Sequence, residues 1–423
     1  MPEMRLINIL KALALFVLMI IPGNCYSPPE QIPAVGVEAE EQGKPVVAVK
    51  LMSDVKEVFY SNEMPFTIVC MKPDSAIEEY FSISRITIKN DYNGLSVHDS
   101  NYGKLSSNLT SVYFRQTTRS GVGRIGGNGY RGRIYIIPGK KKGTISVLNR
   151  LDVDNYLKGV LPAEMGVRRD DEYESLKAMA VAARTYALHK IQRGGGKGLL
   201  ESTIMDQVYR GFDNEYYAAS RAVDETSGEV LKYGDKLIQV QYFAVCGGRT
   251  ERIEDVWGGD SLPYYRVVND GDYCAWAKSY FWEEEFSREL LERRLNTYFI
   301  NKYGEPLPGN LKDIKVLKRS RSGRVKLLKI YTTQTQVELY ADKIRVHIGT
   351  VDDPSKRLPS TLFELDVERD AFGDLRYVRF IGRGNGHGIG MCQCGAIGRA
   401  RAGYNYRQIL QKYYPGTSLE KLY

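Results

Sequence analysis

The chain has 423 residues, of which 43% are hydrophobic and 26% are charged, values that exclude a mostly disordered chain and leave room for two or three domains. The net charge of +8 is mild and spread along the sequence, and it gives little support to a nucleic-acid-binding protein. The 30 tyrosines, each with a flat apolar ring and a polar tip, would suit a carbohydrate-facing groove, although most are expected to fill the core.

Residues 1–25 have the pattern of an export signal. Arg5 and Lys11 precede the apolar run 12–21, which is too short to span a bilayer well and is followed by small and polar residues. Cys25 leaves a lipoprotein signal open, although the residues before it do not match the usual lipobox. We therefore expect an exported protein of the periplasm or cell envelope, which contacts a membrane only through the signal or a lipid anchor.

The next two segments differ in composition. Residues 26–44 are polar and rich in proline and glutamate, as a linker would be. From residue 45 to about 150, short β-branched or aromatic runs alternate with Gly, Asn, Asp and Pro, which predicts a β-rich N-terminal part. The runs are VVAVKL, KEVFYS, FTIVCM, ISRITIK, SVYF and RIYIIP.

An alanine-rich helix is predicted between the acidic residues 170–172 and the glycine run 194–196. Its alanine density predicts close packing, so we expect this helix to be buried. The residues that fall on one helical stripe are Leu176, Met179, Ala180, Ala183, Tyr186 and Ala187.

Helices and strands then follow one another without a regular βαβ rhythm, which predicts an α+β fold. We expect residues 151–423 to form one core that carries an inserted β/α segment at about 283–350. Helices are predicted over 214–226, 283–300, 396–401 and 406–413, where Asn405 and Gln408 match a capping box. Strands are predicted over 228–233, 236–245, 324–333, 336–341, 344–349 and 362–368.

Glycine occupies every second position from Gly382 to Gly390. Each glycine in a strand costs roughly 0.5–1 kcal/mol relative to alanine, so five of them need a reason. If the stretch is extended, one face is bare backbone that something large can approach closely, and the other face carries the intervening side chains. The plainer alternative is a glycine-rich loop with a solvated histidine. The intervening residues are Arg383, Asn385, His387 and Ile389.

Glu164 is the first candidate for acid–base chemistry. It follows Pro162 in an otherwise apolar stretch, and a carboxyl group held among apolar side chains keeps its proton nearer to neutral pH. Such a group can act as a general acid, whereas composition alone favours an ordinary solvated glutamate.

The cysteines offer two further alternatives. In an oxidising compartment Cys246, Cys274, Cys392 and Cys394 could form disulfides, or they could form a metal cluster. The one-residue gap of the CQC pair lacks the spacing of zinc knuckles, so zinc is weakly indicated. Cys246 paired with His387 could also be a thiol nucleophile, an interpretation that export disfavours. The sequence has neither a Gly-x-Ser-x-Gly elbow nor an H-E-x-x-H motif.

Several motifs in order resemble the SpoIID/LytB family of stage II sporulation protein D type peptidoglycan lytic transglycosylases. The resemblance covers about residues 44–423. The motifs are LDVDNYLKGVLPAEM, ESLKAMAVAARTYAL, DQVYRGF, AVDETSGEVLKYGDKLIQVQYFAVCGGRTERIEDVWGG, RVHIGT with LPSTLFEL, and GRGNGHGIGMCQCGAIGRARAGYNYRQILQKYYPGT.

The resemblance implies a catalytic role for Glu164, which matches the glutamate of the family's Pro-x-Glu-Met motif. It implies cleavage of the β-1,4 bond between N-acetylmuramic acid (MurNAc) and N-acetylglucosamine (GlcNAc), with formation of a 1,6-anhydro end. One glutamate suffices if the C6 hydroxyl of the substrate is the nucleophile. The resemblance also implies a glycan-binding cleft beside the alanine-rich helix and no required cofactor. The expected substrate-binding residues are Arg184, His387, Gln393, Asn385 and Arg383.

The chain departs from the family pattern at its cysteines. Some members bind zinc through a histidine and two cysteines around the CGGRT motif, but here Val240 and Arg252 stand at two of these positions and only Cys246 matches. This leaves a Cys246–Cys274 bridge or a four-cysteine cluster open. Because some relatives resemble enhancers of wall amidases, the alternative function is a non-catalytic peptidoglycan-binding enhancer. The expected partners are peptidoglycan glycan strands and, in that alternative, a wall amidase.

Overall fold

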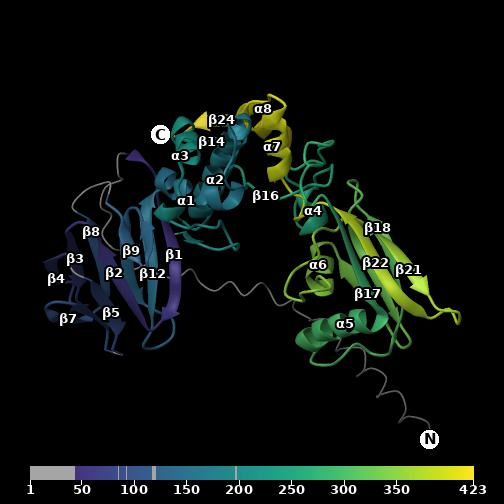
Figure 1. Cartoon of the computed structure of the whole chain (residues 1–423), viewed down its shortest axis with the longest axis horizontal. Coiled ribbons are helices and arrows are strands. Elements are labelled where there is room, and N and C mark those ends of the chain that lie inside the picture. The colour runs from purple at the N-terminus through teal and green to yellow at the C-terminus, as the bar shows by residue number, and fades with distance from the viewer. Residues whose placement is uncertain (1–42, 84, 92, 117–120, 196–197) are drawn as a thin grey trace, which may run out of the picture.

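The computed structural model describes residues 43–423 with the exception of 84, 92, 117–120 and 196–197 (Figure 1). The predicted export signal with Cys25, and all but the last two residues of the predicted linker, lie outside the described residues. Within the described part of the chain, no helix is both long and apolar enough to cross a membrane.

Two sheets form the N-terminal part, as the alternating pattern predicted (Figure 1). One has the strand order β13-β1-β12-β11-β8-β3-β4 and the other the order β10-β9-β2-β5-β6-β7. The ring of Tyr60 on β2 stacks on that of Phe114 on β8 with 3.6 Å between centroids, so side chains of the two sheets share one core. The strands are β1 Val46–Val55, β2 Glu57–Asn62, β3 Phe66–Met71, β4 Ile77–Ser82, β5 Ile86–Asn90, β6 Leu95–Asp99, β7 Gly103–Leu109, β8 Ser111–Gln116, β9 Gly123–Ile125, β10 Asn128–Tyr130, β11 Arg133–Pro138, β12 Ile145–Asp152 and β13 Leu199–Glu201.

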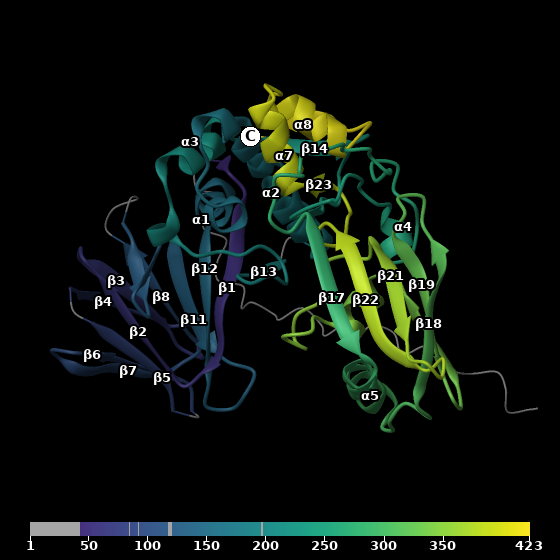
Figure 2. The same ribbon diagram turned by 45° about the vertical axis from the view of Figure 1, so that its right-hand side comes forward.

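A helical layer follows the first sheet and joins its core. In Figures 1 and 2 these helices lie between the two N-terminal sheets and a second lobe, which is formed by residues 281–383. The helices are α1 Val153–Met165, η2 Asp170–Glu172, α2 Tyr173–Arg193, η3 Phe212–Asn214, α3 Tyr217–Glu225, α4 Ile253–Val256, α7 Gln393–Arg401 and α8 Tyr406–Tyr413. The short strands among them are β14 Glu229–Tyr233, β15 Lys236–Leu237, β16 Tyr242–Phe243, β23 Met391–Cys392 and β24 Ser418–Lys421.

The alanine-rich helix α2 is buried, as predicted. It packs against α1, α3, α7, α8 and β14, and its small side chains allow these close approaches. The capping box at Asn405 and Gln408 is also confirmed at the start of α8. Together these elements confirm the α+β class.

A second hydrophobic core lies in the lobe formed by residues 281–383 (Figure 2). Its two sheets have the orders β17-β22-β21 and β18-β19-β20, and buried side chains from Phe286 to Phe380 fill the space between them and α5. The elements of this core therefore run beyond residue 350. They are β17 Phe281–Ser287, α5 Arg288–Tyr303, β18 Leu311–Arg319, β19 Val325–Thr332, β20 Gln336–Tyr340, α6 Asp342–Ile348, β21 Phe363–Arg369 and β22 Leu375–Arg383.

Two sequence predictions in this lobe are wrong. The strand predicted over 344–349 is helix α6, because Ile344 and Ile348 lie one helical turn apart and both point into the second core. The helix predicted from residue 283 begins only at Arg288, since β17 continues to Ser287, whose hydroxyl caps α5 by accepting from Leu290 N.

The glycine stretch is not one extended strand. Gly382 belongs to β22, but the next four alternate glycines all have positive φ angles, between 76° and 120°. The backbone there turns repeatedly, with positive φ angles that glycine adopts more easily than other residues.

Candidate active site

Glu164 lies in the last turn of α1, which begins at the N-cap Asp152. The Asp152 carboxylate accepts a hydrogen bond from Asn155 N at 3.0 Å, which satisfies a free N–H of the first turn. Pro162 lies inside the helix and removes one helical donor. The sequence singled out Glu164 as a candidate but predicted no helix over residues 153–165.

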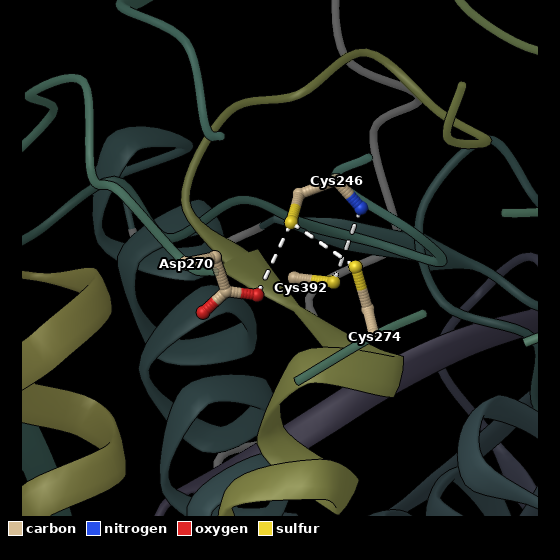
Figure 3. Close-up of side chains that lie close together, drawn as sticks. All are labelled: Cys246, Asp270, Cys274 and Cys392. Carbon is tan, nitrogen blue, oxygen red and sulfur yellow. Dashed lines mark hydrogen bonds between the residues drawn. The ribbon is translucent and has the colours of Figure 1, made fainter. Parts of the chain in front are cut away.

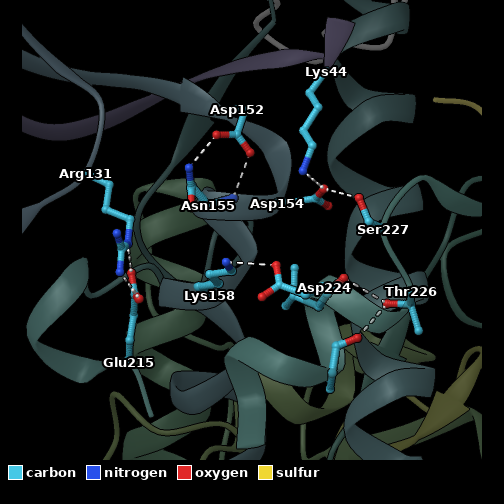
Figure 4. A network of polar contacts seen from close by, with 12 residues as sticks. Lys44, Arg131, Asp152, Asp154, Asn155, Lys158, Glu215, Asp224, Thr226 and Ser227 are labelled. Atoms are coloured by element: carbon cyan, nitrogen blue, oxygen red, sulfur yellow. Dashed lines mark hydrogen bonds and ion pairs between the residues drawn. The ribbon is translucent and has the colours of Figure 1, made fainter. Parts of the chain in front are cut away.

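A polar network fixes α1 in place (Figure 4). Buried Asp154 accepts hydrogen bonds from Lys44 Nζ at 3.0 Å and from Ser227 Oγ at 2.6 Å. Lys158, one turn on, forms an ion pair of 2.8 Å with Asp224 of α3. The start of α1 is therefore tied to two other segments.

Arg184 belongs to this network and does not line the cleft. Its side chain is fully buried, and its Nη2 lies 2.9 Å from Asp154 Oδ1. Nη1 donates to the carbonyl oxygen of Glu229, and Nη2 also donates to that of Val223. The expectation that Arg184 contacts substrate is corrected by this position: the arginine acts as the counterion of a buried carboxylate.

The loop that follows β13 packs directly on α1. A Cβ at Gly159 would lie 2.6 Å from Tyr209 Cε2, so only glycine permits this approach. The packing brings Val208 N within 3.1 Å of Glu164 Oε1, to which it donates a hydrogen bond. This loop carries the DQVYRGF motif, which therefore orders one oxygen of Glu164.

Gln393 orders the other oxygen. It is the first residue of α7, and its Nε2 donates to Glu164 Oε2 at 3.3 Å and to the Glu164 carbonyl oxygen at 3.2 Å. From the sequence we expected Gln393 to bind substrate, and the structure places its side chain on Glu164.

Burial raises the pKa of Glu164 above its ordinary value, and the hydrogen bonds from Val208 and Gln393 oppose this shift without cancelling it. The carboxyl group is therefore more easily protonated than a solvated glutamate. This is the property expected of a general acid.

Glu164 faces an open cleft with a volume of about 600 Å³. Of the predicted substrate-binding residues, Asn385, His387 and Gln393 line it, whereas Arg184 and Arg383 do not. Arg383 lies at the end of β22 with an exposed side chain. The lining residues are Glu164, Tyr186, Ile204, Met205, Asp206, Val208, Gln241, Tyr242, Phe243, Ala244, Trp257, Asn385, Gly386, His387 and Gln393.

His387 is held by backbone atoms on both ring nitrogens. Nδ1 accepts from Ile389 N at 3.1 Å, so Nε2 carries the proton and donates to Tyr242 O, also at 3.1 Å. Burial lowers the pKa of His387 to about 4. A neutral ring with both nitrogens engaged orders the cleft wall and does not serve as an acid–base group.

The alternate glycines let the chain pack against residues 241–247. A Cβ at Gly386 would lie 2.7 Å from Phe243 Cβ, and one at Gly390 would lie 2.1 Å from Gln241 O. The close approach inferred from the sequence is thus made by a neighbouring segment of the same chain, and it positions Asn385 and His387 at the cleft.

The sequence placed Tyr186 on the stripe of the alanine-rich helix and indicated no role for Asp206, Tyr242 or Trp257, although all four lie within motifs that carry the family resemblance. Asp206 is already engaged: Oδ1 accepts from Tyr186 Oη at 2.6 Å, and Oδ2 accepts from Lys190 Nζ and from Glu201 N. Among the described residues lining the cleft, Glu164 is therefore the carboxylate without a salt-bridge partner.

The cysteines meet in a different set from the one expected. Cys246, Cys274 and Cys392 lie together with Asp270, whereas Cys394 lies outside this group. The family arrangement of one histidine and two cysteines does not fit this chain, because Val240 is a buried apolar side chain and Arg252 is paired with Glu254.

Comparison with known proteins identifies two family models in the chain. Residues 141–233 match the SpoIID model, described as stage II sporulation protein, and residues 275–390 match a domain of unknown function, DUF8618. The first match contains Glu164, and the second contains the whole of the lobe formed by residues 281–383.

The chain is also similar to individual proteins. An uncharacterized protein of Brachyspira hyodysenteriae is 32% identical over 292 residues, which cover 69% of this chain and 72% of that protein. The amidase enhancer of Bacillus subtilis is 30% identical over 62% of this chain, but the match spans only 40% of that relative. Stage II sporulation protein D of B. subtilis is 26% identical over 67% of this chain and 79% of that protein.

Proposed function

The chain belongs to the SpoIID/LytB family, and from this premise we propose that it is a peptidoglycan lytic transglycosylase. It cleaves the β-1,4 bond between MurNAc and GlcNAc and leaves a 1,6-anhydroMurNAc end. Family membership supports a role connected with the cell wall, and the expected export signal agrees with action in the envelope. The observation that carries the proposed chemistry is a single carboxyl group of raised pKa, Glu164, at the wall of an open cleft.

Glu164 begins the reaction as the general acid. Its raised pKa favours the protonated form, which donates its proton to the glycosidic oxygen as the bond to the leaving sugar breaks. Val208 and Gln393 fix both carboxyl oxygens and so hold the acid in one orientation.

Glu164 then acts as the base. A hydrolase that uses a pair of carboxylates needs a second one to attack or to activate water. Asp206 does not suit this role, since Tyr186, Lys190 and Glu201 N occupy its oxygens. The ionised Glu164 instead removes the proton from the C6 hydroxyl of MurNAc, which attacks C1 and closes the anhydro ring.

The cleft supports binding of an extended glycan. Trp257 is 46% exposed and stands beside His387, with 5.1 Å between ring centroids, so one ring face can stack on a sugar. Trp257 also lines a neighbouring cavity of about 520 Å³, with Tyr340, Asp342 and Arg357 of the second lobe. We propose that a glycan strand passes Trp257 and occupies both spaces.

Digestion of purified sacculi tests this activity. We expect the wild-type protein to release products with 1,6-anhydroMurNAc ends, detected by mass spectrometry, and the Glu164→Gln variant to release about 10²–10⁴-fold fewer. Glu63→Gln, at an exposed glutamate of the N-terminal lobe, is the control. Undiminished release by Glu164→Gln would refute the assignment.

A second function is favoured by one relative, whose name is amidase enhancer. In that case the protein would bind peptidoglycan and stimulate a wall amidase without cleaving glycan itself. Wild-type protein that releases no anhydro products, yet accelerates an added amidase on the same sacculi, would support this function in place of the first.

A further inference from the structure

Four buried side chains from three separate segments converge beside the candidate active site (Figure 3). Cys246 follows β16, Asp270 and Cys274 lie in the loop after α4, and Cys392 ends β23. One donor atom from each of the four lies within 4.8 Å of the other three. Buried polar groups need partners, so this meeting of four ligand atoms requires an explanation.

The distances suit a tetrahedral metal ion. Cys246 Sγ lies 3.4 Å from Cys274 Sγ and 3.1 Å from Asp270 Oδ2. In a tetrahedral zinc site with Zn–S bonds of about 2.3 Å, sulfur atoms are about 3.8 Å apart. Outward movements of a few tenths of an ångström would therefore open the site for one ion.

Asp270 is oriented as a ligand would be. Its Oδ1 accepts from Arg399 Nη2 at 2.8 Å and from Tyr413 Oη at 2.7 Å, which leaves Oδ2 facing the sulfur atoms. A Cβ at Gly395 would lie only 2.4 Å from Oδ2, so glycine keeps α7 close to this carboxylate. Partners that fix the second oxygen are typical of metal-bound carboxylates.

The surroundings also favour thiolates. Cys392 Sγ accepts hydrogen bonds from Cys246 N and from Gly395 N, each at 3.2 Å. Two buried guanidinium groups are near: Arg399 on Asp270, and Arg324, whose Nη2 donates to Cys246 O at 2.8 Å. Backbone N–H donors and nearby cations stabilise the negative charge that three thiolates and a carboxylate bring together.

We propose that Cys246, Asp270, Cys274 and Cys392 bind one Zn²⁺ ion in a closed tetrahedral site. Three sulfur ligands and one carboxylate oxygen match zinc, and four protein ligands leave no position for water or substrate. Binding converts three thiols to thiolates and releases their protons to solvent. This set shares only Cys246 with the arrangement of one histidine and two cysteines.

A disulfide explains the cluster less well. A bond between Cys246 and Cys274 would leave Cys392 unpaired and would remove the Cys246 thiol that donates to Asp270 Oδ2. That oxygen would then be a buried acceptor facing sulfur atoms without a donor, which is unfavourable. Zinc satisfies all four side chains at once.

The ion would also support the candidate active site. Cys392 is the N-cap of α7 and directly precedes Gln393, which holds Glu164. Cys246 lies in the segment whose Ala244 carbonyl accepts from Cys394 N at 3.0 Å. Zinc would therefore join the start of α7 to the cleft wall and act on stability and geometry without contacting substrate.

Metal analysis of the full exported chain tests the proposal. Protein purified under reducing conditions, treated with equimolar Zn²⁺ and desalted, is expected to retain one zinc per chain by mass spectrometry. Cobalt substitution is expected to give the charge-transfer and strong visible bands of a tetrahedral thiolate site. Cys274→Ser and Cys392→Ser should each weaken zinc retention at least tenfold, while the control variants Cys394→Ser and Cys70→Ser should retain it.

The readout does not depend on glycan cleavage, so it separates this proposal from the proposed activity. Since the serine variants could fail to fold, the cobalt spectrum of the wild-type protein is a test that needs no substitution. A wild-type protein that retains no metal and gives no tetrahedral cobalt spectrum would overturn the site. Unchanged zinc retention in folded Cys274→Ser would overturn the ligand set.

Discussion

Gln393 Nε2 donates to Glu164 Oε2 over 3.3 Å and joins two residues that are 229 positions apart in the sequence. The contact links the start of α7 to the end of α1 at the wall of the cleft. With Val208 N on the other oxygen, it leaves the carboxyl group little freedom to rotate. The orientation of the proposed acid is thus set by long-range packing.

The Gln393→Ala variant is expected to move the alkaline limb of the pH profile of kcat/KM to higher pH. The Gln393 hydrogen bond stabilises the charged carboxylate and lowers the pKa of Glu164, which burial raises. Without this bond the acid stays protonated to higher pH. Gln336→Ala, at an exposed position of β20, is the control. An unmoved or acid-shifted limb in Gln393→Ala would contradict the assignment.

His387 is expected to make stability fall in mild acid. Burial lowers its pKa to about 4, so between an ordinary pKa of about 6.5 and this value the unfolded chain binds the proton and the folded chain does not. The contribution of neutral His387 to the free energy of unfolding is fully present above about pH 6.5 and is lost as the pH falls towards about 4. The total loss is at most about 3 kcal/mol.

The His387→Gln variant tests this expectation, because glutamine can still donate to Tyr242 O and accept from Ile389 N without titrating. Denaturant unfolding from pH 7 to 4 should show a smaller loss of stability in this variant than in the wild type. Parallel curves for the two proteins would exclude a buried neutral histidine.

Asp154→Asn is expected to destabilise the protein by about 3–5 kcal/mol at neutral pH, because it leaves the buried Arg184 guanidinium without its counterion. Burial tends to raise the pKa of Asp154, but Arg184 and the hydrogen-bond donors bring it below the ordinary value. This stabilisation is present above the unfolded pKa and is lost as the pH falls through the folded pKa.

Asp224→Asn is the matched control for Asp154. Asp224 pairs with Lys158 of the same helix, but its side chain is 57% exposed, so we expect a loss of less than about 1 kcal/mol. Urea unfolding of both variants measures the difference. Equal losses would mean that the Arg184 pair is not the main anchor of α1.

Trp257→Ala is expected to raise KM for glycan strands about tenfold with a smaller change in kcat, since we propose that the ring binds sugar away from the reacting bond. Trp276→Ala is the control, because Trp276 is similarly exposed, at 43% against 46%, but stacks on Arg401 and does not line the cleft. If the two variants raise KM equally, the Trp257 ring is not a specific stacking surface for sugar.

Local patterns allowed part of the secondary structure to be predicted. The alternation of residues 45–150 indicated β1, β2, β3, β5, β8 and β11, and the alanine stripe indicated α2, because each pattern depends on residues within a few positions of one another. The same logic failed at residues 344–349. The spacing of Ile344, Val346 and Ile348 fits a strand. In the structure Ile344 and Ile348 lie on one face of helix α6 and pack into the second core.

The sequence by itself determined the α+β class, the burial of α2, the capping box of α8 and the choice of Glu164 as a candidate. Only the tertiary structure decided that Arg184 pairs with Asp154, that Asp206 is already engaged, and that Asp270 joins three of the cysteines. The physical reason is distance along the chain. Caps and amphipathic stripes depend on neighbours within one or two turns. The contacts of Tyr186 with Asp206, Arg184 with Asp154 and Gln393 with Glu164 join residues 20, 30 and 229 positions apart and depend on packing between elements.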